Sequence, residues 1–424
     1  MYRAIIRFAI AIIAIVSCLY GIRIAYRMGI ARTFSEYAES VNSLPAEYHI
    51  YDPTPLAEQA INLSPSDPEA HFARGVVLTD EGRNVEAVKE FERAVALSPR
   101  DYRFWIRLGS MREGIGDETG ALDAYNETVR LAPFYSQPRW QLGNLLLRMG
   151  RLQEAFAELR NAAQSDQSLL PGLIDLAWGV SGGDTRVVEE FIQPQTTSWR
   201  LALARTFAKH GKAAESVSLF RAAGNDASAD ERRALINELL AAKQFNEAYE
   251  IWSVGRNTNS SGVVAITDGG FEGQIHFDEP GFGWQLLRGS QSVRFSLDKG
   301  GPHVGSNSLR LDWSGDSNPA TPVISQLVLV EPNTRYRLRF TARTHEVVTG
   351  GRALVVVTDA SGSDAHTVAQ SAPLPDGSSD WQEYSIEFTT GEATRAVRIN
   401  VERQSCGNAL HTFAQHLHAS KSSS

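Results

Sequence analysis

The residues best suited to ligand chemistry in this 424-residue chain lie in its last third. Asp268 and Glu272 carry carboxylate oxygens, which are the ligands that a hard cation such as calcium prefers. We expect instead that Asp268 caps a turn and that Glu272 is solvated, with calcium ligation as the alternative. Trp284 follows the loop Pro280–Gly283, which also holds Phe282. An exposed aromatic face in a loop can stack on a ring-shaped ligand, so Trp284 and Phe282 are the candidate ligand-binding residues.

Other aromatic residues of this region are expected in the core. Trp313 is in phase with two leucines, Tyr336 is in phase with Leu338 and Phe340, and Trp381 stands at a strand entry. The chain has no nucleophile elbow, phosphate-binding loop, HExxH motif or facing pair of catalytic acids. We therefore expect no enzyme activity and no cofactor.

The composition narrows the classes of partner. The net charge is −8 and the pI is near 5.8, which disfavours a nucleic acid because that affinity comes mostly from cationic side chains. The two cysteines, Cys18 and Cys406, stand far apart in the chain, so neither a disulfide framework nor a thiolate metal site is expected. Three histidines close to the C-terminus have no spacing typical of a metal site: His411, His416 and His418.

Small residues recur every 34 residues in the first half of the chain. Two series of glycines keep this step, followed by an alanine series, a series of larger residues and closing prolines: Gly75, Gly109 and Gly143; Gly82, Gly116 and Gly150; Ala87, Ala121 and Ala155; Phe91, Tyr125 and Leu159; Pro65, Pro99 and Pro133. A fixed period of this length, with small residues where two helices touch, is typical of a helix-turn-helix solenoid.

These residues resemble the tetratricopeptide repeat over 53–165, as in Trp105-x2-Leu108-Gly109. Segment 166–254 is expected to hold degenerate helical repeats. The resemblance implies that the solenoid binds a protein partner. Three arginines of the first helices, Arg74, Arg107 and Arg112, belong either to the binding groove or to solvated surface.

The N-terminus predicts a membrane anchor. Phe8–Ile22 carries no charge, and apolar residues beyond the flanking arginines extend the stretch, so 4–27 is expected to be one transmembrane helix. A cleaved signal is a second possibility. A lipoprotein is a third, because Ile15-Val16-Ser17-Cys18 resembles the bacterial lipobox with Cys18 as the acylated residue. Segment 28–52 is expected to be a partly helical connector.

Beyond a polar linker at 255–262, the apolar period changes from 3.6 to 2, as in Tyr336, Leu338 and Phe340. Segment 263–405 is therefore expected to be a two-sheet sandwich. Asp268-Gly269-Gly270-Phe271-Glu272, then Gly283-Trp284 and Ser308-Leu309-Arg310-Leu311, resemble the start of a carbohydrate-binding jelly roll with a galactose-binding-like layout. The tail, 406–424, has neither strand alternation nor the acidic pair that ends such modules, and is expected to be disordered or atypical.

The predicted architecture is an all-α tetratricopeptide solenoid followed by an all-β jelly-roll sandwich, with one N-terminal transmembrane helix. The order of these parts is similar to that of bacterial envelope proteins, some of them associated with exopolysaccharide systems. This resemblance implies a single-pass membrane scaffold, with its body in the periplasm or outside the cell. The solenoid would bind a protein and the sandwich a polysaccharide. The alternative is a protein-only assembly factor whose sandwich binds no sugar.

Overall fold

The structure is a computed structural model, and it describes residues 2–42, 52–256, 266–273, 275, 279–286, 293–313, 322–348, 351–362 and 366–404. The chain divides into two compact units, Met1–Gln193 and Pro194–Ser424. Most of the predicted linker lies outside the described residues. The whole tail lies outside them too, with Cys406, His411, His416 and His418.

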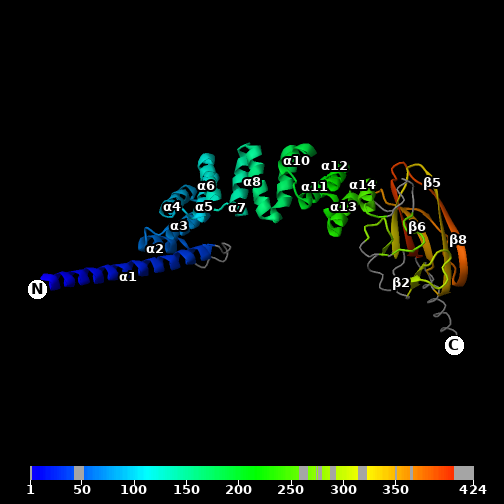
Figure 1. The fold of residues 1–424 in the computed structure, drawn as a ribbon, viewed down its shortest axis with the longest axis horizontal. Coiled ribbons are helices and arrows are strands. Elements are labelled where there is room, and N and C mark those ends of the chain that lie inside the picture. Colours follow the sequence, from blue (N-terminus) through cyan, green and yellow to red (C-terminus); the bar gives the residue numbers. More distant parts are fainter. Residues whose placement is uncertain are drawn as a thin grey trace, which may run out of the picture. The chain divides into compact units, whose positions relative to one another are not determined.

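The first unit is helical throughout its described residues, and its helices form antiparallel pairs (Figure 1). They are α1 (Tyr2–Asn42), α2 (Thr54–Leu63), α3 (Pro68–Asp80), α4 (Asn84–Leu97), α5 (Tyr102–Gly114), α6 (Glu118–Leu131), α7 (Ser136–Arg148), α8 (Leu152–Ser165), α9 (Leu170–Ser181) and α10 (Thr185–Ile192).

The three clear repeats are the pairs α3–α4, α5–α6 and α7–α8, as the 34-residue period predicts. Each pair turns at a glycine with a left-handed backbone, where φ is +73° at Gly82, +82° at Gly116 and +75° at Gly150. The alanines and the larger residues of the second helices are buried: Ala87, Ala121, Ala155, Phe91, Tyr125 and Leu159. The predicted small-residue contact between paired helices is therefore confirmed.

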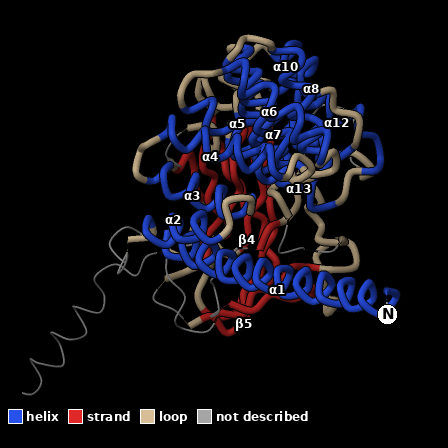
Figure 2. The backbone as a smooth tube through the Cα atoms, turned by 90° about the vertical axis from the view of Figure 1, so that its left-hand side faces the viewer, coloured by secondary structure: helices blue, strands red, loops and turns tan. Residues whose placement is uncertain are grey.

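The predicted boundary between anchor and connector is not a structural boundary. Helix α1 runs from Tyr2 to Asn42 (Figure 2), so 28–42 continue the apolar segment as the same helix. Ala31, Ser35 and Ala38 on this part are buried, and they lie against α2 and α3. The end of α1 therefore takes the place of the first helix in an opening repeat, with α2 as its second helix.

The degenerate segment also forms helices. The second unit begins with α11 (Thr197–Lys209), α12 (Ala213–Ala223), α13 (Ala229–Ala241) and α14 (Phe245–Ser253), which pair as the sequence predicts. Helix α10 of the first unit is an addition to the prediction. It begins at Asp184, whose carboxylate accepts the N–H of Arg186 at 2.9 Å, and it buries Val188, Phe191 and Ile192.

The C-terminal part of the second unit is built of strands, drawn in red in Figure 2. They are β1 (Gln285–Leu286), β2 (Val293–Asp298), β3 (Ser308–Trp313), β4 (Ile324–Leu329), β5 (Arg335–Val347), β6 (Ala353–Asp359), β7 (Thr367–Gln370), β8 (Gly377–Thr389) and β9 (Ala396–Arg403). A five-stranded sheet has the order β1-β4-β9-β6-β7, and two further antiparallel pairs are β2-β3 and β5-β8.

The core of the sandwich lies between β5 and β8 on one side and β4, β6 and β9 on the other. It contains Leu338 and Ile386 from the first group, packed with Val357, Val397 and Ile399. The alternation of β5 and β8 places their apolar residues inward, as predicted. Strand β4 shows no such alternation because five of its six residues are buried, which is the pattern of a strand covered on both faces.

The last helix and the sandwich share a buried carboxylate. Glu279 is 6% exposed, and it accepts hydrogen bonds from Trp252 Nε1 at 2.6 Å and from the N–H of Gly283 at 3.2 Å. Arg256 approaches it at 3.4 Å and lies over the indole ring of Trp252. Because Trp252 belongs to α14 and Gly283 precedes β1, these contacts fasten the helix to the start of the sandwich.

Candidate functional site

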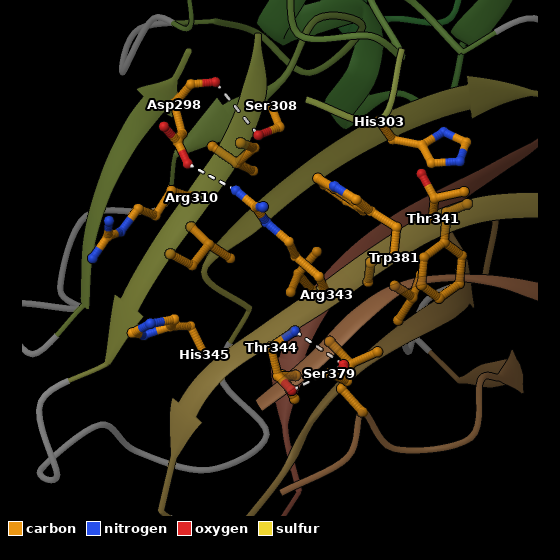
Figure 3. A pocket seen from close by; sticks show the side chains of 18 of the residues that line it. Asp298, His303, Ser308, Arg310, Thr341, Arg343, Thr344, His345, Ser379 and Trp381 are labelled. Carbon is orange, nitrogen blue, oxygen red and sulfur yellow. Dashed lines mark hydrogen bonds and ion pairs between the residues drawn. The ribbon is translucent and has the colours of Figure 1, made fainter. Parts of the chain in front are cut away.

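The largest feature of the sandwich is a cleft of about 1210 Å³ lined by β3, β5 and β8 (Figure 3). Pockets for small ligands have volumes of roughly 300–1,000 Å³, so this cleft has room for more than one ring. Three tryptophans line it: Trp284, Trp313 and Trp381. Ile399 and Val401 of the opposite sheet form part of its apolar floor.

Trp381 lies at the centre of a cationic and aromatic group on the rim (Figure 3). Its Nε1 donates to the carbonyl of Gly301 at 3.2 Å, and the Arg343 guanidinium lies 5.1 Å from its ring centre. The ring of His303 meets it edge-on at 5.8 Å. The indole is therefore fixed in orientation and half-buried, which suits stacking against a flat ligand.

Trp284 also has a fixed position, and it is half-buried where the sequence suggested an exposed residue. Its Nε1 donates to the Asp268 carbonyl at 2.9 Å, and its ring stacks on Phe271 at 5.1 Å. It lines the cleft together with Phe271. The sequence therefore selected a residue of the cleft wall, while its use by a ligand remains a prediction.

Phe282 was the wrong choice as a ligand-binding residue. Its side chain is 1% exposed and packs against Tyr249 and Trp252 of α14, at 5.2 and 5.7 Å between ring centres. Trp313 differs in the opposite sense. It was expected in the core, but it is partly exposed and faces the cleft.

The two acidic candidates fold the N-terminal loop of the domain. The Asp268 carboxylate accepts the N–H groups of Glu272 at 2.8 Å and Gly273 at 3.0 Å, which is the turn capping that the sequence suggested. The Glu272 carboxylate accepts from the N–H groups of Ser306 at 2.7 Å and Asn307 at 3.2 Å. Glu272 therefore holds two loops together. In the part of the chain that the structure describes, no three His, Cys, Asp or Glu side chains gather as a metal site.

Most charges around the cleft occur in pairs. Arg343 donates to Asp298 at 3.2 Å and to the Gly300 carbonyl at 3.0 Å, and Arg310 donates to Asp312 at 2.8 Å. The hydrogen bond from Asp312 raises the pKa of Arg310, which stays charged at any physiological pH. The cleft therefore offers hydrogen-bonding groups on both walls without a strong net charge.

Two of the three solenoid arginines are engaged within the fold. Arg74 of α3 pairs with Glu58 of α2 at 3.1 Å and with Glu90 of α4 at 3.4 Å. Arg112 pairs with Glu92 at 2.8 Å. Arg107 is exposed on α5. Of the three, Arg107 is therefore the residue with most freedom to meet a partner.

Helix α1 is the one helix of the described residues that is long and apolar enough to cross a membrane, over Ile10–Ser40. The side chains from Ile10 to Tyr26 are exposed, in contrast to Ala31 and Ala38. Cys18 is exposed on the same apolar stretch. An exposed apolar helix surface of this length suits either a bilayer or a signal segment.

Comparison with known families assigns both parts of the body. Residues 55–99 and 80–136 match the family model described as tetratricopeptide repeat. Residues 265–408 match the model described as carbohydrate binding domain.

Curated relatives resemble the repeats alone. The human "DnaJ homolog subfamily C member 3" is 29% identical over 112 residues, which is 26% of this chain and 22% of that protein. "Protein FlbA" of Caulobacter vibrioides is 28% identical over 104 residues, covering 24% of this chain and 17% of that protein. The chain thus spans less than a quarter of the length of these relatives.

Solved structures give a similar result at low similarity. Pseudomonas aeruginosa pilF matches with 16% identity and a TM-score of 0.33, covering 53% of this chain and 90% of that one. MamA from Desulfovibrio magneticus matches with 14% identity and a TM-score of 0.30, covering 47% and 98%. The family matches and the geometry together show that this chain carries tetratricopeptide repeats followed by a C-terminal carbohydrate-binding domain.

Proposed function

We propose that this protein is a membrane-anchored scaffold of the bacterial cell envelope, whose solenoid binds a protein and whose C-terminal domain binds a polysaccharide. The observation that carries the polysaccharide part is the cleft with three tryptophans inside a segment that matches the carbohydrate-binding model. Trp381 and Trp284 are the residues that stack on sugar rings. Neither contact requires a metal or a catalytic acid.

The anchor and the two binding parts act through proximity. Two modules on one chain raise the effective concentration of each ligand near the other, commonly to the millimolar range for short connections. Helix α1 holds this assembly at the membrane, with the C-terminal domain on the outer side where polysaccharides are found. The apolar exposed surface of α1 supports the anchor, and the domain type supports the orientation.

The sugar-binding proposal is tested with the full chain in detergent micelles on an array of bacterial and plant polysaccharides. We expect binding that falls at least tenfold in Trp381→Ala and Trp284→Ala. Phe134→Ala is the matched control, because Phe134 is an aromatic residue of the solenoid that is 88% exposed. Binding to no polysaccharide would contradict the proposal and favour the protein-only assembly factor.

The location is tested separately. A reporter fused to the C-terminus, or protease protection in spheroplasts, shows on which side of the membrane the domain lies. A cytoplasmic C-terminus would contradict the proposed orientation.

A further inference from the structure

The wall of the cleft contains two β-strand edges. Ser308–Trp313 of β3 and Leu338–Val348 at and beyond β5 line it without interruption. Successive side chains of a strand point to opposite faces, so a strand that presents one face contributes every second residue. An unbroken run from each strand means that the strand edges themselves border the cleft. We name this part of the cleft the edge groove.

Both edges lack a neighbouring strand among the described residues. Strand β3 pairs with β2 on one side, through Leu309 opposite Leu297 and Leu311 opposite Phe295. Strand β5 pairs with β8 on one side, through Phe340 opposite Tyr384. The two pairs are separate sheets. The N–H and C=O groups on the remaining edges are therefore a template for one more strand.

The floor of the edge groove is apolar. Leu338 of β5, Ile399 and Val401 of β9 and Val355 of β6 line it from the interior of the sandwich. Leu338 and Ile399 are 9% and 6% exposed. A strand lying between β3 and β5 would point every second side chain onto this floor, so apolar residues at alternate positions fit it.

The rest of this chain does not supply that pattern in its sequence. Twenty residues follow Gln404, and their larger apolar members are Leu410, Phe413 and Leu417. These are spaced by three and four, where a half-buried strand needs a spacing of two. The occupant is therefore expected to come from another protein.

The outer rim indicates the charge of that segment. The outward charged side chains of β3 and β5 along the edge groove include three arginines, Arg310, Arg339 and Arg343, against Asp312 and Glu346. Opposite charges on neighbouring strands stabilise a pair. Arg343 also spans one end of the edge groove, because its guanidinium reaches Asp298 of β2 (Figure 3).

We infer that the edge groove binds an extended segment of a partner protein as an additional β-strand, with apolar residues at alternate positions and acidic residues between them. Such a strand completes one sheet by bonding to β3 and β5 at once, at about 4.8 Å from each. The six residues of β3 match a bound strand of about 20 Å. The inference stands apart from sugar binding at Trp381, which belongs to β8 on the other side of β5.

The probe is a synthetic nine-residue peptide that alternates isoleucine and glutamate, added to the full chain in detergent micelles. We expect saturable binding, with slower amide hydrogen exchange in both 308–313 and 338–348. A peptide of the same composition in scrambled order should bind at least tenfold more weakly, which is about 1.4 kcal/mol. The alternating peptide with N-methyl groups on every second amide should lose binding likewise, because its side chains are kept and its ladder bonds are removed.

Charge reversal tests the register of the partner. Arg339→Glu should weaken binding of the glutamate peptide severalfold and strengthen that of an isoleucine–lysine peptide. Arg335→Glu is the matched control, because Arg335 is exposed on the same strand and does not line the cleft. This control should change neither affinity.

Four results would overturn the inference. They are equal binding of the alternating and scrambled peptides, and exchange protection on one strand alone or on neither. The third is binding that appears only after deletion of residues 405–424, which would show that the chain's own tail occupies the groove. The fourth is protection of both strands that grows with protein concentration and without peptide, which would show that a second copy does.

Discussion

Gly75 lies directly against the aromatic ring of Phe91. A Cβ atom at Gly75 would come within 2.8 Å of two ring carbons, which is closer than side-chain carbons approach one another. Tyr125 repeats this contact at Gly109, and Leu159 repeats it at Gly143, 34 residues apart each time. The period in the sequence is therefore the record of a close helix–helix contact that recurs once per repeat.

Replacement of this glycine should destabilise the solenoid. Phe91 is 1% exposed and cannot move aside, so Gly75→Ala should lower the free energy of unfolding by about 1–3 kcal/mol through overpacking. Gly179→Ala is the control, because Gly179 is in helix α9 and a Cβ there meets nothing within 4 Å. This control should be neutral or stabilising by up to about 1 kcal/mol. Urea unfolding measures both, and equal effects would contradict the packing argument.

The end of α1 should behave as part of the solenoid. Ala38 is fully buried beside Ala57 and Val77, so Ala38→Leu should destabilise the first repeat by about 1–3 kcal/mol. Tyr37→Leu changes an exposed neighbour and should have little effect. Thermal unfolding in micelles measures the difference. A solenoid insensitive to Ala38→Leu would mean that 28–42 is a connector after all.

His71 should make the stability of the first repeats depend on pH. Burial lowers the pKa of His71, but hydrogen bonds to Glu90 Oε2 at 2.7 Å and to the Pro65 carbonyl at 2.9 Å outweigh it and raise the pKa above its usual value. Arg93 opposes this rise, and Arg74 also lies beside Glu90. Two acceptors on one ring require both ring nitrogens to carry protons.

The sign follows from the raised folded-state pKa. The stabilisation is complete below the unfolded value of about 6.5 and is lost as the pH rises through the higher folded value. The free energy of unfolding should therefore fall between pH 6 and the alkaline side of neutrality, and His71→Gln should remove this slope. His210→Gln, at an exposed position, is the control. A slope that survives in His71→Gln would assign the effect to other groups.

Glu279 should be needed to join α14 to the sandwich. Glu279→Ala leaves the indole N–H of Trp252 and the Arg256 guanidinium without their acceptor, and loss of a buried partner costs about 1–3 kcal/mol. Amide exchange should quicken in both α14 and the loop before β1. Glu392→Ala, an exposed carboxylate of the same unit, should change neither. Unchanged exchange in Glu279→Ala would show that apolar packing by Phe282 alone suffices.

Local patterns in the sequence predicted the elements well where one face of each element is buried. The three clear repeats, the paired helices α11–α14 and the alternating strands β3, β5 and β8 were all legible for this reason. Strand β4 and helix α10 were not, since β4 is covered on both faces and α10 is eight residues long. The cleft was legible only at Trp284. His303 and Arg343 carry no local signal, because their role comes from meeting Trp381 across the fold.

The sequence by itself determined that paired helices stack through glycine and alanine and that a sandwich follows them. Contacts within a repeat join residues about sixteen apart, so their spacing survives in the linear chain. Only the tertiary structure decided that Phe282 faces α14, that Trp284 and Trp381 border one cleft, and that β3 and β5 each keep an open edge. Those relationships depend on which distant backbones pair and which side chains meet, and neither leaves a period in the sequence.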